Sequence, residues 1–255
     1  MRRTVTGLAV IIVAAALVWG PAASAGLVPA PSRLLDGAAA PSTSTGPGTP
    51  ANDYYTVQGR ARHPYTPKRA GEVEYCPLDR LNRPVCAYGE LTVDLRHRAQ
   101  ERERQKIDVD PPGWGHNREV DIPATAVTGS RPYHGYLFNR SHLVADSLGG
   151  APSRANIITG TRTQNVGSTQ VDGQYAGGMA HTETLARDYL KHDRVRNCPL
   201  YYAATANYTG SELVPRTVTI DIASCDRTVD EHVVVPNTAA GFTIDYATGT
   251  WRADH

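Results

Sequence analysis

The segment between Arg131 and Lys191 concentrates the side chains that could do chemistry. It begins with GYLFNRSHLVADSLGG, in which a short apolar strand over 136–138 is expected to lead into NRSH at 139–142. His142 would then lie at a strand-to-loop exit beside the Arg140 guanidinium, and such exits commonly carry function. Because the unperturbed pKa of histidine lies near neutrality, a neutral His142 could take a proton from water.

Two asparagines follow His142, at the two ends of the segment NIITGTRTQN. The amide oxygens of Asn156 and Asn165 are hard, neutral ligands suited to Mg²⁺, which keeps most of its waters and completes its shell with phosphate oxygens. Glu183 and Arg187 are four residues apart and would share one face of a helix. An ordinary ion pair explains those two taken alone, but they also add a carboxylate and a guanidinium to the same region.

Hydrophobic periodicity predicts the elements that position this cluster. The predicted strands are 201–206, 217–223, 231–235 and 242–246, and the predicted helices are 94–107 and 182–192. This mixture predicts an α+β fold with mostly antiparallel pairing, in one domain over residues 53–255. The predicted helix 94–107 interleaves arginines with glutamates, which favours a solvated face over a nucleic-acid patch.

The order NRSH, Asn156, Asn165, Glu183 and Arg187 resembles the DNA/RNA non-specific endonucleases, whose ββα-metal core carries an Asp-Arg-Gly-His signature. The segments SHLVADSLGG, NIITGTRTQN and GSELVPR are similar to the secreted bacterial DNases of that family. The resemblance spans about 64–251, and its specific part is 135–216. It implies a ββα-metal nuclease core on a mostly antiparallel sheet flanked by helices.

By this resemblance, His142 is the general base that activates the attacking water, and Asn165 is the direct Mg²⁺ ligand. Asn156 would support the active-site loop, Glu183 would hold a metal-bound water, and Arg187 would lie near the scissile phosphate. The implied activity is hydrolysis of phosphodiester bonds in DNA to 5′-phosphate ends. It would be largely sequence-non-specific, because phosphate contacts carry no sequence information. RNA as a further substrate and Mn²⁺ in place of Mg²⁺ are left open.

Two positions depart from the family signature. Asn139 replaces the aspartate and Ser141 replaces the glycine, whereas Arg140 matches the arginine beside the base. Without that carboxylate, the orientation of His142 would depend on other groups. The alternative function is therefore a non-catalytic nucleic-acid- or surface-binding module with a nuclease-like fold. The sequence contains neither G-x-S-x-G nor H-E-x-x-H, which argues against a serine hydrolase or a zinc protease.

The N-terminal residues predict a secreted, extracellular protein. An arginine pair at 2–3, an apolar run at 8–19 and Ala23-Ser24-Ala25 have the order of a signal peptide that is cleaved after Ala25. The apolar run is 12 residues long, short of the ~20 that a membrane-spanning helix needs, so no membrane association is expected after cleavage. Residues 26–52 are rich in Pro, Ala, Ser and Thr and predict a flexible linker or pro-segment.

Cysteine count and charge complete the predictions. Four cysteines suit an oxidising compartment and allow three pairings, of which Cys76–Cys86 with Cys198–Cys225 closes the shortest loops. The formal net charge of +1 indicates no polyanion partner by itself. However, residues 131–196 carry eight basic against five acidic side chains, and 197–255 carry three against seven. This asymmetry predicts a nucleic-acid groove near the candidate residues. The oligomeric state is left open.

Overall fold

Six antiparallel strands form the main sheet of the structure, a computed structural model that describes residues 52–254. Their order is β1-β12-β11-β10-β3-β2. Their bounds are β1 Thr56–Val57, β2 Glu74–Tyr75, β3 Cys86–Leu91, β10 Leu200–Asn207, β11 Thr217–Ser224 and β12 Asp230–Pro236. The predicted α+β class with antiparallel pairing is confirmed. The predicted signal peptide, and the predicted linker up to residue 51, lie outside the described residues.

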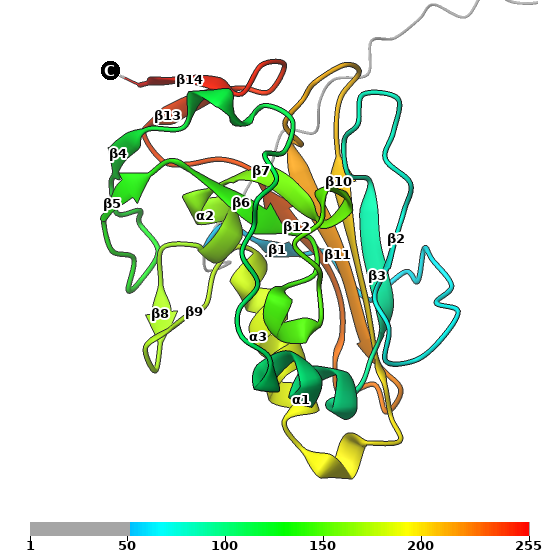
Figure 1. The fold of residues 1–255 in the computed structure, drawn as a ribbon. Helices are drawn as coiled ribbons and strands as arrows, with labels where there is room; N and C mark the ends of the chain where they lie inside the picture. Colours follow the sequence, from blue (N-terminus) through cyan, green and yellow to red (C-terminus); the bar gives the residue numbers. More distant parts are fainter. Residues whose placement is uncertain (1–51, 255) are drawn as a thin grey trace, which may run out of the picture. The chain divides into compact units, whose positions relative to one another are not determined.

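In the described part of the chain, four further antiparallel strand pairs and three helices lie to one side of this sheet (Figure 1). The pairs are β4 Glu119–Ile122 with β5 Tyr133–Tyr136, β6 Phe138–His142 with β7 Ile157–Thr161, β8 Gln170–Val171 with β9 Gln174–Tyr175, and β13 Phe242–Asp245 with β14 Thr250–Ala253. The helices are α1 Val93–Glu101, α2 Arg162–Val166 and α3 Met179–Leu190. Short 3₁₀ turns span Trp114–His116, Asp146–Leu148, Arg154–Asn156 and Asp193–Val195.

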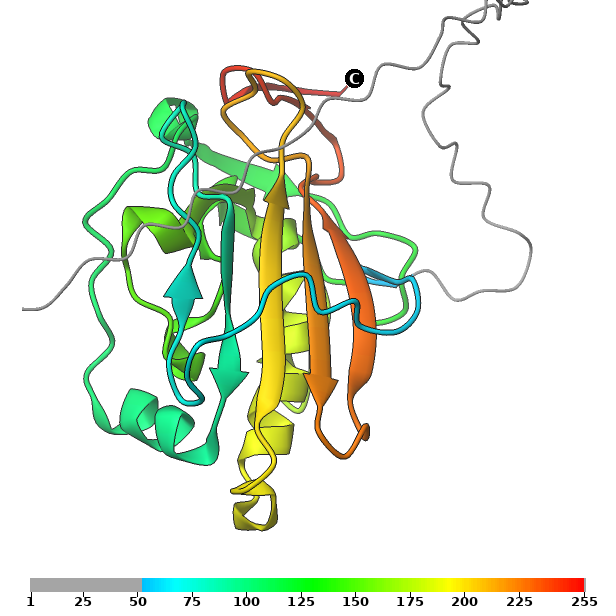
Figure 2. The same cartoon turned by 90° about the vertical axis from the view of Figure 1, so that its right-hand side faces the viewer.

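The two faces of the main sheet are covered differently, as the strand alternation of β10 illustrates. Tyr202 points into the principal core, where α3 contributes Met179 and Leu190, and α3 lies behind the sheet in Figure 2. Tyr201 belongs to the opposite face, where it contacts Tyr65 in a smaller apolar cluster. The segment after β1 crosses this outer face (Figure 2). Because both faces are covered, the sheet is a rigid support for α3.

Helix α1 is shorter than the sequence predicts. The Thr92 hydroxyl caps it by accepting a hydrogen bond from the Leu95 amide, but the helix ends at Glu101 rather than near Ile107. Arg102 is extended and donates to the Asp146 carboxylate at 2.7 Å. This tertiary contact takes the chain out of the helix, and residues 102–111 form a segment without helix or strand. The predicted boundary was therefore wrong.

Other element boundaries shift by a few residues. Helix α3 occupies 179–190 rather than 182–192, and the predicted strand over 136–138 is divided at Leu137 between β5 and β6. NRSH therefore lies inside β6 rather than after it. Gly178 precedes α3 with a φ of 52°, and a side chain there would overlap the Thr163 and Gln164 carbonyl oxygens. A glycine is thus required where α2 and α3 approach each other.

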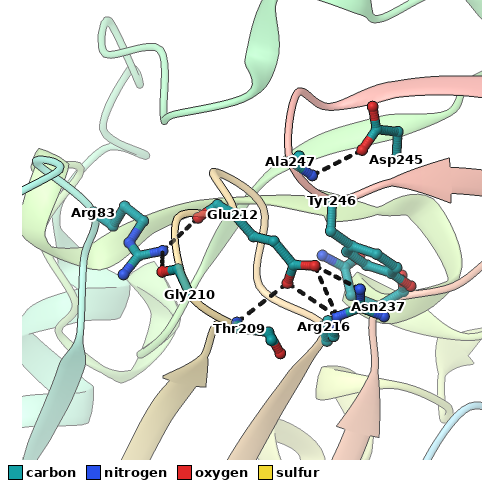
Figure 3. Close-up of polar contacts among 9 residues, drawn as sticks. All are labelled: Arg83, Thr209, Gly210, Glu212, Arg216, Asn237, Asp245, Tyr246 and Ala247. Atoms are coloured by element: carbon teal, nitrogen blue, oxygen red, sulfur yellow. Dashed lines mark hydrogen bonds and ion pairs between the residues drawn. The ribbon is translucent and has the colours of Figure 1, made fainter.

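A polar network connects the loop between β10 and β11 to neighbouring segments (Figure 3). Glu212 pairs with Arg216, and Arg83 donates to the Gly210 and Glu212 carbonyls, which fixes the loop between β10 and β11. The buried Asn237 amide joins this loop to β7, because it donates to Pro215 and Thr159 carbonyls and accepts from the Thr161 amide. These hydrogen bonds hold β7, the strand that precedes α2, in place.

Both predicted disulfides, Cys76–Cys86 and Cys198–Cys225, are present. The first closes a loop of sequence separation 10 at β3, and the second, of separation 27, links the start of β10 to the end of β11. Within residues 52–254, no helix has the length and apolar character to span a membrane.

Candidate active site

The candidate site is built on β6, β7 and α2, which follow one another as two antiparallel strands and a helix. His142, the last residue of β6, pairs in register with Ile157, the first residue of β7. Strand β7 runs directly into α2, whose first turn is capped by the Thr161 hydroxyl accepting from the Gln164 amide. This connection brings Asn165 of α2 to the end of β6.

His142 and Asn165 line the same two adjacent cavities. The volumes are about 520 and 410 Å³, and both cavities are also lined by Arg104. Glu183 of α3 lines the smaller cavity, whereas Asn139 and Arg140 line the larger. The structure thus brings together five of the residues singled out in the sequence. Asn156 and Arg187 line neither cavity.

The environment of His142 keeps its imidazole neutral. Partial burial lowers the pKa of His142 to about 4, with Asp146 acting against the shift and Arg104 and Arg102 adding to it. Among residues 52–254, no hydrogen bond to a ring nitrogen of His142 is present. A neutral imidazole that faces a cavity is able to accept a proton there.

Asn165 is held by the strand that carries His142. The buried Ser141 hydroxyl donates to Oδ1 of Asn165 at 2.9 Å. Because Ser141 and His142 are neighbours on β6, their side chains leave opposite faces of the strand. The serine thus fixes the amide from behind while the histidine faces the cavity.

Glu183 and Arg187 form the predicted i,i+4 pair on α3, with Arg187 Nη1 3.4 Å from Glu183 Oε2. Burial raises the pKa of the Glu183 carboxyl above its ordinary value, and the Arg187 guanidinium opposes that shift. Arg187 also donates to the Thr184 hydroxyl at 2.8 Å. In this arrangement Arg187 contacts its own helix.

Asn156 supports the loop that follows His142. Its side chain has no exposed area, donates to the Val144 and Ala151 carbonyls, and accepts from the Val144 amide, each at 2.9 Å. Its backbone carbonyl also accepts from the Leu143 amide at 2.8 Å. The side chain therefore uses its hydrogen-bonding groups on the backbone of residues 144 and 151.

The two signature positions next to Ser141 have different surroundings. Arg140 donates to the Asp110 carboxylate at 2.5 and 3.0 Å and stacks on Trp114 at 4.5 Å. Asn139 lines the cavity, and within residues 52–254 its side chain makes no hydrogen bond. The acid whose charge acts on His142 is Asp146, which lines the smaller cavity together with the histidine.

The segment that follows α1 contributes to the site but was not predicted to do so from the sequence. Arg104 and Lys106 line the larger cavity, although the region was interpreted as the solvated face of a helix. Within residues 52–254, the Arg104 guanidinium forms no ion pair. Its exposed positive charge next to His142 suits contact with an anion. The alternation of charges in the sequence does not predict this position of Arg104, because the position depends on where α1 ends.

The donor groups at the cavity suit a hydrated cation. Within residues 52–254, no group of three or more His, Cys, Asp or Glu side chains is arranged to hold a metal ion. The smaller cavity offers amide oxygens from Asn165 and Gln100 and carboxylates from Glu183 and Asp146. Mg²⁺ prefers hard oxygen donors and usually keeps several of its waters. A cavity with a few oxygen donors and room for water therefore suits such a cation.

A two-strand-and-helix unit that presents a histidine and an amide to one cavity defines the architecture of the site. The DNA/RNA non-specific endonuclease family model matches residues 64–225, and the chain belongs to this family. The match begins where the resemblance in the sequence begins.

Individual relatives agree with this assignment. The chain is 32% identical to a deoxyribonuclease from Streptococcus dysgalactiae subsp. equisimilis over 220 residues, which are 76% of this chain and 64% of that protein. It thus spans less than two thirds of the curated relative's length. The structure of Sda1 nuclease with a bound zinc ion superposes with a TM-score of 0.69 at 32% identity, over 79% of this chain and 97% of the other.

A second solved structure supports the fold. NucA from Streptococcus agalactiae with a bound magnesium ion superposes with a TM-score of 0.56 at 24% identity. The superposition covers 77% of the present chain and 84% of the NucA chain. The arrangement of a mostly antiparallel sheet with few helices is therefore common to these nucleases and the present chain.

Proposed function

We propose that this protein is a secreted, divalent-metal-dependent endonuclease that hydrolyses phosphodiester bonds of DNA with little sequence specificity. The observation that carries the proposal is that His142 and Asn165 line the same two cavities. Family membership and the name of the deoxyribonuclease relative support DNA as a substrate. RNA is an additional substrate class to test.

His142 is the general base in this proposal. Its lowered pKa means that the imidazole is unprotonated at neutral pH and can accept a proton from an attacking water. Arg104 lies beside it at the cavity and would contact the phosphate oxygens of the substrate. A contact of this kind stabilises charge that develops in the transition state, and loss of one typically costs about 10² to 10³ in rate.

Asn165 and Glu183 would hold the cation, for which we propose Mg²⁺. When bound, the cation would stabilise negative charge on the phosphoryl oxygens and on the departing 3′-oxygen. Asn165 offers its amide oxygen directly, and Glu183 would orient water near it. Ser141 positions the Asn165 amide, and Arg187 limits the rise in the pKa of Glu183. Of the two related structures, Sda1 nuclease has a bound zinc ion and NucA has a bound magnesium ion, and both are divalent cations.

Export follows from the predicted signal peptide together with the two disulfides, which form and persist in oxidising compartments. Hydrolysis with water attacking the phosphorus and the 3′-oxygen leaving gives 5′-phosphate ends. Contacts to backbone phosphates carry no base information, which accounts for low sequence specificity.

Degradation of plasmid DNA tests the proposal. The oxidised protein should fragment the plasmid with Mg²⁺ and stop when EDTA is added. His142→Ala should reduce the rate by about 10² to 10⁴, the usual contribution of a general base. The matched control is His192→Ala, because His192 is exposed beyond the end of α3 and lines neither active-site cavity. Folded protein that cleaves neither DNA nor RNA with Mg²⁺ or Mn²⁺ would favour the non-catalytic binding module.

A further inference from the structure

Arg162, the first residue of α2, is held between two tyrosine rings beside the candidate active site. Its guanidinium carbon lies 4.7 Å from the ring centroid of Tyr133 on β5 and 4.4 Å from that of Tyr175 on β9. Only 9% of Arg162 is exposed. Figure 1 shows α2 beside the hairpins that supply these rings. The aromatic faces stabilise the cation without using its N–H groups.

The hydrogen-bond donors of Arg162 have no acceptor in the described part of the chain. A guanidinium carries five N–H donors, and buried arginines are normally paired. Within residues 52–254, the Arg162 side chain makes neither an ion pair nor a hydrogen bond. Its nitrogen atoms are not fully enclosed, and Arg162 lines a cavity of about 120 Å³. An outside group that enters this cavity can therefore approach the guanidinium.

The lining of this cavity favours an anion. Arg131 is a second cation on its wall, and no carboxylate lines it. Asp53 lies behind Ser168, but its two oxygens accept four hydrogen bonds from Ser168 and Thr169. The volume is well below the roughly 300 Å³ at which small-molecule pockets begin. A single phosphate group therefore suits it better than a whole nucleotide.

We propose that Arg162 and Arg131 form a subsite for a backbone phosphate of the nucleic-acid substrate, separate from the scissile phosphate. The inference rests on the proposed nuclease function and extends it. Arg162 and Asn165 are three residues apart on one helix, about 4.5 Å along its axis at 1.5 Å per residue. The subsite would therefore bind a phosphate close to the cleaved bond. A planar guanidinium can bind phosphate through two parallel hydrogen bonds.

Arg162 is not needed to join the β4–β5 hairpin to the β8–β9 hairpin. The β4–β5 hairpin is already joined to the segment before β8, because the Arg131 amide donates to the Ser168 carbonyl at 3.0 Å. The Ser130 and Ser168 hydroxyls also share a 2.8 Å hydrogen bond. A purely structural role for Arg162 would change the melting temperature, whereas a phosphate contact changes the salt dependence of binding.

The test measures binding of a short labelled single-stranded DNA to the His142→Ala protein, which is expected to cleave DNA about 10² to 10⁴ more slowly, at several salt concentrations. Arg162→Gln in this background should bind about tenfold more weakly at low salt. The slope of log K against log salt should become shallower by about 0.7, the value for one phosphate contact on a single strand. Arg131→Gln should shift both quantities in the same direction. Arg194→Gln is the control, because Arg194 is exposed at the opposite end of α3 from α2.

The parent protein in this test is His142→Ala. If the added Arg162→Gln substitution leaves the melting temperature, the DNA affinity and the salt slope unchanged, the subsite is overturned. If Arg162→Gln lowers the melting temperature, the Arg131→Gln variant is used instead, because Arg131 is exposed, and an unchanged salt slope in that variant also overturns the subsite. A parent that binds no DNA or RNA would instead refute the proposed function, and the subsite with it. Binding by the parent with unchanged slopes in both variants refutes the subsite alone.

Discussion

The Ser141 hydroxyl donates to the Asn165 amide oxygen at 2.9 Å and so joins β6 to α2 at the candidate active site. The family signature has glycine at this position, which has no hydroxyl to offer. In this chain the strand that ends in His142 thus also fixes the asparagine proposed to hold the cation. Ser141 is fully buried, so its hydrogen bond does not compete with bulk water.

Ser141→Ala should raise the Mg²⁺ concentration needed for half-maximal cleavage by about fivefold. One neutral hydrogen bond contributes about 1 kcal/mol, and its loss lets the Asn165 amide rotate. The measurement is cleavage rate against Mg²⁺ concentration. Ser153→Ala is the control, because the Ser153 side chain makes no capping hydrogen bond. An unchanged Mg²⁺ requirement in Ser141→Ala would show that this hydrogen bond does not position the ligand.

The pH profile should follow the lowered pKa of His142. The imidazole is the active base only when unprotonated, and a pKa near 4 keeps His142 in that form from neutral pH down to about 5. The acid limb should therefore lie well below the ordinary 6.5 of histidine, and the raised pKa of Glu183 sets the pH at which activity first falls. Cleavage at saturating Mg²⁺ across this range measures it. A midpoint at or above 6.5 would mean that burial does not control His142.

Asn156→Ala should destabilise the fold by about 3 kcal/mol or more. The change leaves the Val144 amide and the Val144 and Ala151 carbonyls without their partner, and unsatisfied buried groups cost about 1 to 3 kcal/mol each. Denaturant unfolding of oxidised protein measures the loss. Asn197→Ala, at an exposed turn, should change stability by less than about 0.5 kcal/mol. Equal stabilities of the two variants would contradict the loop-supporting role of Asn156.

Much of the fold could be predicted because its strands have clear periodicity. Val218, Ile220 and Ile222 alternate along β11 with side chains of the other face, and all three belong to the principal core. The same reasoning located β10, β12 and β13 to within a residue. The ending of α1 could not be predicted, because the contact between Arg102 and Asp146 joins segments 44 residues apart.

The candidate site was predictable only in part for a related reason. His142, Asn165 and Glu183 belong to a local order that resembles a known family, and they line adjoining cavities. Arg104 belongs to no motif and reaches the cavity only because α1 stops at Glu101. The contacts of Arg162 with Tyr133 and Tyr175 could not be predicted either, because the two rings come from hairpins that are separate in sequence.

Arg104→Gln should lower kcat/KM by about tenfold or more while leaving the melting temperature near that of the parent. Arg104 is exposed, so its loss removes positive charge from the cavity without opening the core. The midpoint of the acid limb should also rise, since Arg104 contributes to lowering the pKa of His142. Arg80→Gln, an exposed arginine that lines neither active-site cavity, is the control. Equal kcat/KM in the two variants would remove Arg104 from the site.

The most direct test of the central claim separates cation binding from proton transfer. Mn²⁺ binding, followed by its paramagnetic resonance signal, and single-turnover DNA cleavage are measured on the parent, His142→Ala and Asn165→Ala. We predict that His142→Ala binds Mn²⁺ like the parent but cleaves at least about 10²-fold more slowly, and that Asn165→Ala loses both properties. Parent-like cleavage by folded His142→Ala, or parent-like Mn²⁺ binding by Asn165→Ala, would contradict the account.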